Sequence, residues 1–207
     1  NIALITDAGT PGISDPGEDL VRICYEQGIE VTSLPGAAAC ITALTLSGLP
    51  TRRFSFEAFL PKEKKERAAV LEELKNDTRT LIVYEAPHHL LGTLKELQNA
   101  LGDRRLTVCR ELTKKFETAF QTTFSEAIRY YEEQGVRGEC VLVIEGRSRE
   151  ELVQEAQQSW EAISVEEHME HYLSTGMDRK SAMKQVAKDR GVGKREIYQM
   201  LLNAENE

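Results

Sequence analysis

The sequence predicts an α/β fold, because short apolar segments of strand length alternate with helical patterns between residues 2 and 145. Each of the first two predicted strands runs into a Gly/Pro-rich break, at residues 6–17 and 34–36. Beyond residue 146 the strand signals stop, and polar and helical patterns follow. We therefore expect an α/β body followed by a helical C-terminal part.

The first 50 residues contain two strand-loop-helix patterns. Residues 2–5 predict a strand, and a helical pattern that ends at Gly28 follows its loop, with apolar positions at Leu20, Val21, Ile23 and Cys24. Residues 29–34 predict a second strand, which breaks at Pro35-Gly36 before the small residues Ala37-Ala38-Ala39-Cys40 begin a helix. Because ligands of open α/β folds lie at strand ends, both loops are expected to meet one pocket. A cofactor site and two ordinary strand-to-helix turns both fit this pattern.

The middle of the chain continues the alternation. Strands are predicted over residues 54–60, 79–85, 106–110, 115–122 and 139–145, the last of them closing the sheet. Helices are predicted over residues 62–75, 87–101 and 123–134, the third capped by Thr123 or Ser125. The second of these helices carries one leucine stripe and ends at Gly102.

The C-terminal part is polar and helical. Residues 147–161 are rich in Gln and Glu, which fits a linker or a loosely attached helix. Helices are predicted over residues 165–173, 179–190 with Asp178 as N-cap, and 194–202. The turn Gly191-Val192-Gly193 joins the last two as in a helix-turn-helix, and we expect them to pack through Ala182, Val186, Ala187, Ile197 and Leu201.

The charge is distributed unevenly along the chain. The 207 residues carry a net charge of −8, and the window 179–195 carries +6, which leaves −14 for the rest. Seven basic residues stand in this window against Asp189: Arg179, Lys180, Lys184, Lys188, Arg190, Lys194 and Arg195. A solvated helix face and a surface for a polyanion both fit, and we favour an RNA-facing role.

Composition excludes several classes of protein. No apolar run approaches the about 18 residues that a membrane span needs, so we expect a soluble, cytoplasmic protein with no membrane partner. The four cysteines, Cys24, Cys40, Cys109 and Cys140, form no Cys-x-x-Cys pair and are expected to be reduced core residues. His88 and His89 have no spaced partner ligands, so no metal site is expected.

The loops carry a family resemblance. Four motifs occur in order, Asp7-Ala8-Gly9-Thr10-Pro11, Asp15-Pro16-Gly17, Leu34-Pro35-Gly36 and Gly48-Leu49-Pro50, and together they resemble the S-adenosylmethionine half-site of the tetrapyrrole-methylase fold. Three more resemble the RsmI-type ribosomal RNA 2'-O-methyltransferases within that fold: Phe56-Glu57-Ala58-Phe59-Leu60-Pro61, Tyr84-Glu85-Ala86-Pro87-His88 and Arg110-Glu111-Leu112-Thr113-Lys114. The resemblance covers nearly the whole chain.

The resemblance implies a two-lobed fold with a helix-turn-helix-like tail. Members of the family begin with about seventy to ninety further residues that hold a Pro-rich strand loop and a Glu-Asp-Thr-Arg motif, so this chain is expected to be a fragment with an incomplete first lobe. The implied domains are residues 1–50 for the rest of the first lobe, 51–147 for the second lobe, 148–163 for a linker and 164–207 for an RNA-binding-like helical module.

The resemblance also implies the site. S-adenosylmethionine would be held by residues of four loops: Asp7, Ala8, Gly9, Thr10, Ile13, Ser14, Ala37, Ala38, Ala39, Tyr84, Glu85, Cys140 and Val141. Arg110 and Lys114 are expected to meet phosphate or alkoxide charge, Glu111 to orient or accept a proton, and Glu85 to be a second candidate base. Without the family, the charges of residues 110–117 would equally fit a surface ion-pair cluster. RNA contacts are expected from Arg179, Lys180, Lys184, Lys188, Lys194 and Arg195.

The expected function is therefore methylation of the 2'-hydroxyl of a cytidine in small-subunit ribosomal RNA by a homodimer that uses S-adenosylmethionine. One alternative is a tetrapyrrole methyltransferase on the same fold, because a fold does not fix a function. Another is a nucleic-acid-binding protein without enzymatic activity. The basic tail argues against the first alternative, and the cofactor loops argue against the second.

Overall fold

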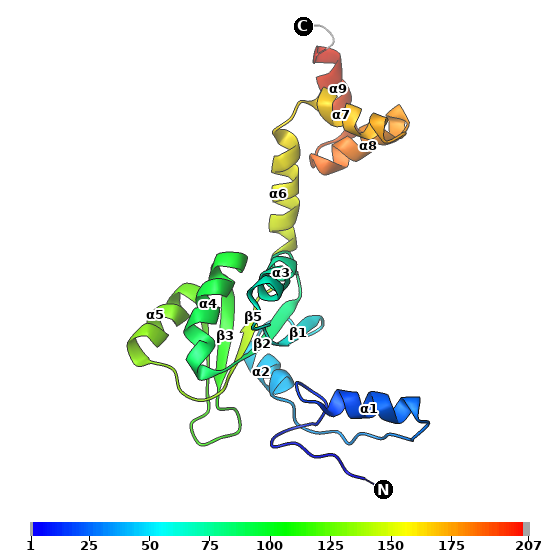
Figure 1. Ribbon diagram of the computed structural model, residues 1–207. Coiled ribbons are helices and arrows are strands. Elements are labelled where there is room, and N and C mark those ends of the chain that lie inside the picture. The colour runs from blue at the N-terminus through cyan, green and yellow to red at the C-terminus, as the bar shows by residue number, and fades with distance from the viewer. Residues whose placement is uncertain (1, 205–207) are drawn as a thin grey trace. The chain divides into compact units, whose positions relative to one another are not determined.

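The computed structural model describes residues 2–204 and divides into two compact units, residues 1–147 and 148–207. Figure 1 shows the helices and strands of both. In the first unit the order is α1 (Gly17–Glu26), α2 (Ala39–Ser47), β1 (Phe54–Phe59), α3 (Lys64–Leu74), β2 (Thr80–Glu85), α4 (Pro87–Leu101), β3 (Arg105–Arg110), β4 (Thr118–Thr123), α5 (Phe124–Gln134) and β5 (Cys140–Ile144). The second unit consists of α6 (Arg149–Glu161), α7 (Val165–Ser174), α8 (Arg179–Asp189) and α9 (Lys194–Ala204).

One five-stranded sheet organises the first unit, with the order β1-β2-β5-β3-β4. The β1–β2 pair is parallel, and the other neighbours are antiparallel. The strand predicted to close the sheet, β5, therefore lies at its centre, which its five buried residues explain. Its start is paired with the ends of β2 and β3, because Cys140 is opposite both Glu85 and Arg110.

Alternation along the strands divides the core between the two faces of the sheet. Leu81, Val83, Leu106, Val108 and Leu142 belong to the cluster that α3, α4 and α5 cover. Ile82, Cys109, Val141 and Val143 belong to a second cluster with Cys40, Ala43 and Leu44 of α2. We call these two sides the α4/α5 face and the α2 face.

Most predicted elements of this region are confirmed. The leucine stripe of α4 is buried, with Leu90, Leu94 and Leu97 fully so, and Thr123 caps α5 by accepting a hydrogen bond from the Glu126 backbone N–H. The strand predicted over 115–122 begins only at Thr118, because Glu111 and Thr113 have φ angles of 52° and 63° and turn the chain. Helix α3 begins at Lys64, after the N-cap Glu63.

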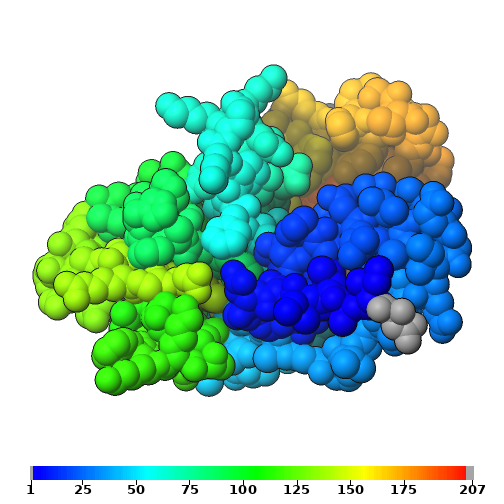
Figure 2. All heavy atoms as spheres, turned by 60° about the horizontal axis from the view of Figure 1, so that its bottom comes forward, coloured from blue at the N-terminus to red at the C-terminus, as the bar shows by residue number. Residues whose placement is uncertain are grey.

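The two strands predicted before α2 are wrong. Residues 2–5 and 29–34 form neither strand nor helix, and most of their apolar side chains are exposed, Ile2 to 96% and Leu34 to 83%. A strand needs a neighbour that satisfies its backbone N–H and C=O groups, and no described residue pairs with either segment. Figure 2 shows this N-terminal part of the chain, in blue, on the surface of the first unit. Helix α1 is confirmed, although Cys24 is only half-buried whereas Cys40, Cys109 and Cys140 are buried.

The second unit has its own core. The expected packing of α8 on α9 is confirmed, because Ala182, Val186, Ala187, Ile197 and Leu201 share one buried cluster with Val165 and Met169 of α7. Asp178 caps α8 through the backbone N–H groups of Lys180 and Ser181. Residues 148–163, predicted as a linker, are mostly the helix α6, which Ser148 caps. None of the described helices is long and apolar enough to cross a bilayer.

Candidate active site

The two N-terminal loops contact each other, as their predicted role at one pocket requires. Both the backbone N–H and the hydroxyl of Thr10 donate to the Ala37 carbonyl oxygen, at 2.9 and 3.0 Å. This approach leaves no space for side chains: a Cβ at Gly9 (φ +76°) would lie 2.9 Å from the Ala37 oxygen, and one at Gly36 would lie 2.8 Å from the Thr10 hydroxyl. Gly9 is therefore required by the loop-to-loop contact as well as by its φ, and Gly36 by the contact alone.

Asp15 shapes the loop between Thr10 and α1. Its carboxylate accepts hydrogen bonds from the backbone N–H groups of Gly12 and Gly17, at 2.9 and 2.7 Å. Asp7, Ala8 and Gly9 stay exposed, as do Ile13 and Ser14, and Ser14 has a φ of 61°. The predicted cofactor residues of this loop thus present mainly backbone and small side chains to solvent.

The start of α2 connects this loop pair to the sheet. The Cys40 backbone N–H donates to the Tyr84 hydroxyl at 2.9 Å, and Tyr84 is opposite Val141 in the β2–β5 pair. Burial raises the pKa of Tyr84 to about 12, so its hydroxyl stays protonated at neutral pH. Phe56 and Phe59 contact the Tyr84 ring edge-on, with centroids 4.9 and 5.7 Å away. Contacts therefore run from Thr10 through Ala37 and Cys40 to Tyr84 and Val141.

Alternation separates the remaining predicted cofactor residues. Tyr84 and Val141 face α2, whereas Glu85 and Cys140 point to the α4/α5 face. The Glu85 carboxylate is buried and accepts hydrogen bonds from the Ala86 backbone N–H at 2.8 Å and the Thr93 hydroxyl at 2.5 Å. Both of its oxygens therefore hold the start of α4. Cys140 is buried as well, and burial raises the pKa of its thiol to about 12.

The charged residues after β3 contact one another. Glu111 accepts a hydrogen bond from the Glu139 backbone N–H at 3.0 Å, and Lys114 Nζ lies 3.3 Å from the Glu111 carboxylate and 3.0 Å from that of Glu139. A Cβ at Gly138 would lie 2.4 Å from Glu111 Cγ, so Glu111 occupies the space that this glycine leaves. The Glu139 N–H lowers the pKa of Glu111, and the carboxylates of Glu139 and Glu111 raise that of Lys114. Both groups are held in their charged forms.

Arg110 has a different environment from Glu111 and Lys114. It belongs to the α4/α5 face, as Leu106 and Val108 on the same strand do, and it donates to the Thr118 hydroxyl and to the Arg137 and Phe116 carbonyl oxygens at 3.2, 3.3 and 3.3 Å. It therefore joins the loops 111–117 and 135–139. The structure does not bring the Arg110 side chain to the α2 face, where Tyr84 and Val141 lie.

The predicted RNA-contacting residues are all exposed in the second unit. The side chains of six residues are exposed on α8 and α9: Arg179, Lys180, Lys184, Lys188, Lys194 and Arg195. Arg190, the remaining cation of the window, is half-buried and donates to the Ile163 and Ser164 carbonyl oxygens at 2.6 and 2.9 Å. The Arg190 guanidinium therefore bonds within the second unit and does not face solvent fully.

Sequence reasoning missed three features near the sheet end. The pairing of Cys40 with Tyr84 joins residues 44 positions apart and left no local signal. The same holds for Glu111 in the space beside Gly138. The third feature is a hollow on the α4/α5 face with three aromatic residues, Phe120, Tyr130 and Tyr131. No group of three or more possible metal ligands occurs within residues 2–204.

Comparisons with known proteins show the family to which the chain belongs. The family model for tetrapyrrole (corrin/porphyrin) methylases matches residues 1–128. The ribosomal RNA small subunit methyltransferase I of Halalkalibacterium halodurans is 48% identical over 197 residues, which cover 95% of this chain and 68% of that protein. The protein of the same name from Bacillus subtilis is 48% identical over 198 residues, which cover 96% of this chain and 68% of the relative.

Solved structures show the same fold at lower identity. A cobalt precorrin-4 methyltransferase of cobalamin biosynthesis is 17% identical with a TM-score of 0.51, over 66% of this chain and 61% of that one. The methyltransferase CobJ is 20% identical with a TM-score of 0.51, over 65% of this chain and 61% of its own. The chain thus spans about three fifths of each of these structures.

Proposed function

We propose, because this chain belongs to the tetrapyrrole methylase family and to its ribosomal RNA small subunit methyltransferase I branch, that it methylates a ribose 2'-hydroxyl of small-subunit ribosomal RNA. The proposed methyl donor is S-adenosylmethionine, and the proposed target is a cytidine. The observation that carries the proposal is the contact series from Thr10 to Val141, which joins the predicted cofactor loops to one end of the sheet.

The residues present fit the proposed cofactor. Ala8, Gly9, Gly36 and Ala37 are exposed and carry a small side chain or none, so a flat ligand can approach their backbone closely. We assign the holding of the cofactor to residues 7–10, 13–14 and 37–39 and to Tyr84 and Val141. Glu85 and Cys140 would contribute through their backbone, because their side chains point to the other face.

The chemistry places three demands on the chain. When bound, the cofactor supplies a methyl group on a positively charged sulfur, and the protein must align the acceptor hydroxyl, exclude water and take up the hydroxyl proton. Lys114 is held charged and is our candidate for stabilising negative charge on the acceptor oxygen. Glu111 fixes Lys114 and is the candidate proton acceptor, and its lowered pKa favours the first of these two roles. The buried Glu85 is less suited to proton transfer, because both of its oxygens accept hydrogen bonds.

Two further proposals follow the family and the charge pattern. The six exposed cations of α8 and α9 would bind the phosphates of the RNA, since the rest of the chain is acidic. We also propose that the protein acts as a homodimer in the cytoplasm, where ribosomal RNA is available. Sedimentation of the purified full-length protein tests the dimer, and a monomer at micromolar concentration would contradict it.

The decisive experiment offers two acceptors to the full-length protein. We expect transfer of labelled methyl groups from S-adenosylmethionine to small-subunit ribosomal RNA, and nuclease digestion followed by mass spectrometry should locate the label on a ribose of cytidine. Uroporphyrinogen, the control acceptor, should remain unlabelled. Transfer to the macrocycle alone would establish the tetrapyrrole alternative, and RNA binding with no transfer to either acceptor would establish the non-enzymatic one.

A further inference from the structure

A second concave surface lies on the α4/α5 face of the sheet, away from the α2 face. It is an open hollow of about 910 Å³ between β4, α5 and the loop before β5. The residues that matter for its chemistry are Arg110, Thr118, Phe120, Tyr130, Tyr131 and Arg137. Its volume falls in the range of about 300–1,000 Å³ that is common for sites of small organic ligands.

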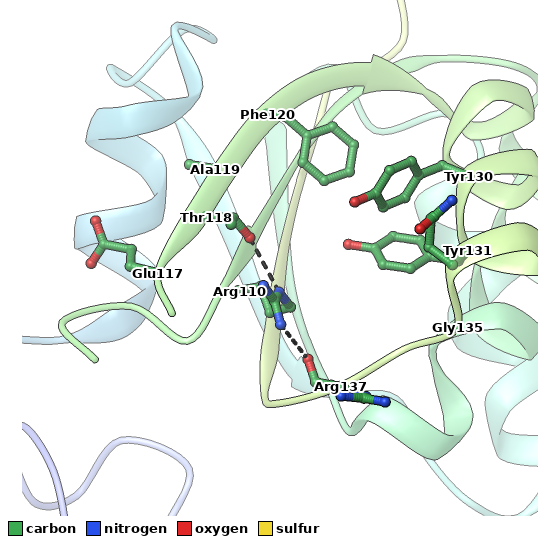
Figure 3. A pocket seen from close by; sticks show the side chains of 10 residues that line it. Arg110, Glu117, Thr118, Ala119, Phe120, Tyr130, Tyr131, Gly135 and Arg137 are labelled. Carbon is green, nitrogen blue, oxygen red and sulfur yellow. Dashed lines mark hydrogen bonds between the residues drawn. The ribbon is translucent and has the colours of Figure 1, made fainter. Parts of the chain in front are cut away.

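Alternation along β4 decides which side chains face the hollow. Thr118 and Phe120 point into it, whereas Ala119 and Gln121 point to the other face, where Gln121 donates to the Ser47 carbonyl oxygen of α2. Figure 3 shows Phe120 opposite Tyr130 and Tyr131, with Arg110 and Arg137 at the lower rim. In the same view the Glu117 carboxylate points away from the rings, and its Oε2 accepts the Thr113 backbone N–H at 2.5 Å.

The hollow carries positive charge that no carboxylate bonds to. Among the described residues, Arg110 donates only to neutral oxygens, those of Thr118, Arg137 and Phe116. The Arg137 side chain has no hydrogen bond or ion pair with any residue in the described part of the chain. Glu117 is the one acid among the described residues that line the hollow, and because its carboxylate is turned away, this surface favours an anion.

Aromatic rings stand beside these cations. Phe120 and Tyr130 lie with centroids 5.3 Å apart, and Tyr131 meets Tyr130 edge-on at 5.1 Å. Tyr130 is 49% exposed, so part of its ring is open to a ligand. Burial raises the pKa of Tyr131, whose hydroxyl therefore remains a donor at neutral pH. Exposed rings next to arginines are the combination that binds unpaired bases together with their phosphates.

We propose that this hollow binds one unpaired nucleotide of the RNA substrate, with the base against Tyr130 and Phe120 and the phosphate at Arg110 and Arg137. The proposal rests on the proposed function, because it assigns a second contact to the same RNA. Arg110 joins the hollow to the loop that carries Glu111 and Lys114, since it bonds to Phe116 and Arg137 in the two loops that Glu111 also joins. A nucleotide held here would fix the strand relative to Lys114.

The test measures binding of a fluorescein-labelled single-stranded RNA of about ten nucleotides to the full-length protein by anisotropy. Tyr130→Ala should weaken binding about tenfold, because it removes the ring on which the base stacks. Tyr130→Phe keeps the ring and should bind like the wild type. Arg137→Ala should reduce the log–log salt slope by about 0.7, the contribution of one phosphate of a single strand.

Arg129→Ala is the matched control, because Arg129 is exposed on the same helix as Tyr130 and does not line the hollow. It removes the same charge as Arg137→Ala and should leave both the affinity and the salt slope close to those of the wild type. If Tyr130→Ala and Arg137→Ala bind RNA like the wild type, the inference is wrong and the proposed function stands. If the wild type itself binds no RNA, both are wrong.

Competition with a mononucleotide distinguishes a site for a nucleotide within RNA from a site for a free nucleotide. Cytidine monophosphate should compete with the labelled RNA only at millimolar concentration, because it offers a single stack and a single phosphate. Competition at the concentration at which unlabelled RNA competes, lost in Tyr130→Ala, would instead identify a site for free nucleotides and would overturn the assignment to RNA.

Discussion

Charged side chains serve different purposes in the two units. After β3, Glu111, Lys114 and Glu139 bond to one another, and the pKa values of Glu111 and Lys114 are shifted toward their charged forms. On α8 and α9, Lys184, Lys188 and Lys194 are exposed and have no ion-pair or hydrogen-bond partner for their side chains within residues 2–204. Charges that are bound to each other hold a geometry, whereas unpaired cations attract an anion from a distance. The sheet end is thus suited to positioning, and the helical surface to attraction.

The largest effect should come from the bonded group. Lys114→Ala removes both ion pairs of the loop, so we expect the methylation rate to fall about a hundredfold while the affinity for S-adenosylmethionine stays within twofold. Single-turnover kinetics and calorimetry measure the two quantities. Lys115→Ala is the control, because Lys115 carries the same charge but has no ion pair among the described residues and lies over the Phe116 ring, at 5.5 Å. Equal losses in the two variants would show that charge alone matters here.

The next largest effect should come from the uncharged contact between Gly9 and Ala37, which we expect to determine the affinity for S-adenosylmethionine. A methyl group at Gly9 would lie 2.9 Å from the Ala37 oxygen, so Gly9→Ala should separate the two loops and weaken S-adenosylmethionine binding at least tenfold. Gly12→Ala is the matched control: Gly12 has a similarly positive φ of +84°, but a Cβ there meets nothing within 4 Å. Calorimetry on the full-length proteins compares them. A loss of the same size in both would point to backbone strain and not to the loop contact.

Sequence patterns predicted the regular elements of the sheet region because local physics determines them. The period of α4 and the apolar runs of β2 and β5 placed those elements within one residue of their bounds. The sheet order lay beyond such reasoning, because it depends on pairing between distant segments. The order in turn decides which face each side chain takes, so Arg110 and Tyr84 could not be assigned to opposite faces from the sequence.

The two strands predicted at residues 2–5 and 29–34 are wrong because strand formation, like sheet order, depends on pairing with a distant segment. Apolar strand-forming residues indicate a tendency, and the strand forms only when a neighbour pairs with it. The loops beside these segments were nevertheless identified, since proline fixes φ and glycine permits positive φ, and both effects are local. Their contact between Thr10 and Ala37 agrees with the expected meeting of two loops at one pocket.

Replacing the unpaired lysines of α8 and α9 should have a smaller effect, and this effect should be specific to RNA binding. Changing Lys184, Lys188 and Lys194 to Glu should weaken binding of single-stranded RNA and lower its log–log salt slope, by about 0.7 for each phosphate that the protein no longer neutralises. The affinity for S-adenosylmethionine should not change. The control variant changes Lys62, Lys64 and Lys65 to Glu, which gives the same net charge on exposed residues near the start of α3. Equal losses in both would mean that RNA responds to the total charge of the protein and not to this surface.

The smallest effect should come from the buried His168 of the second unit, through the pH dependence of stability. His168 is fully buried, stacked on Trp160 with ring centroids 3.9 Å apart, and its Nδ1 accepts a hydrogen bond from Arg190 Nε at 3.2 Å. Its Nε2 has no hydrogen-bond partner within residues 2–204, although Asp189 Oδ2 lies 3.5 Å away. His171 and Tyr172 are further titratable neighbours. Burial and the Arg190 charge lower the pKa of His168 below its ordinary value of 6.5.

A lowered pKa in the folded state means that the unfolded chain binds a proton more readily. The contribution of His168 to stability is therefore complete above pH 6.5 and is lost as the pH falls through its lower folded-state value. Urea unfolding followed by the fluorescence of Trp160, the only tryptophan, should give a smaller free energy of unfolding at pH 5 than at pH 7.5. His168→Gln should reduce this difference, whereas His171→Gln, which replaces an exposed neighbour, should leave it nearly unchanged. If the two variants showed the same pH dependence of the free energy of unfolding, the buried imidazole of His168 would not be its source. The contact between Arg190 and His168 would then have no measurable effect on stability, and Arg190 would behave like the exposed cations of α8 and α9.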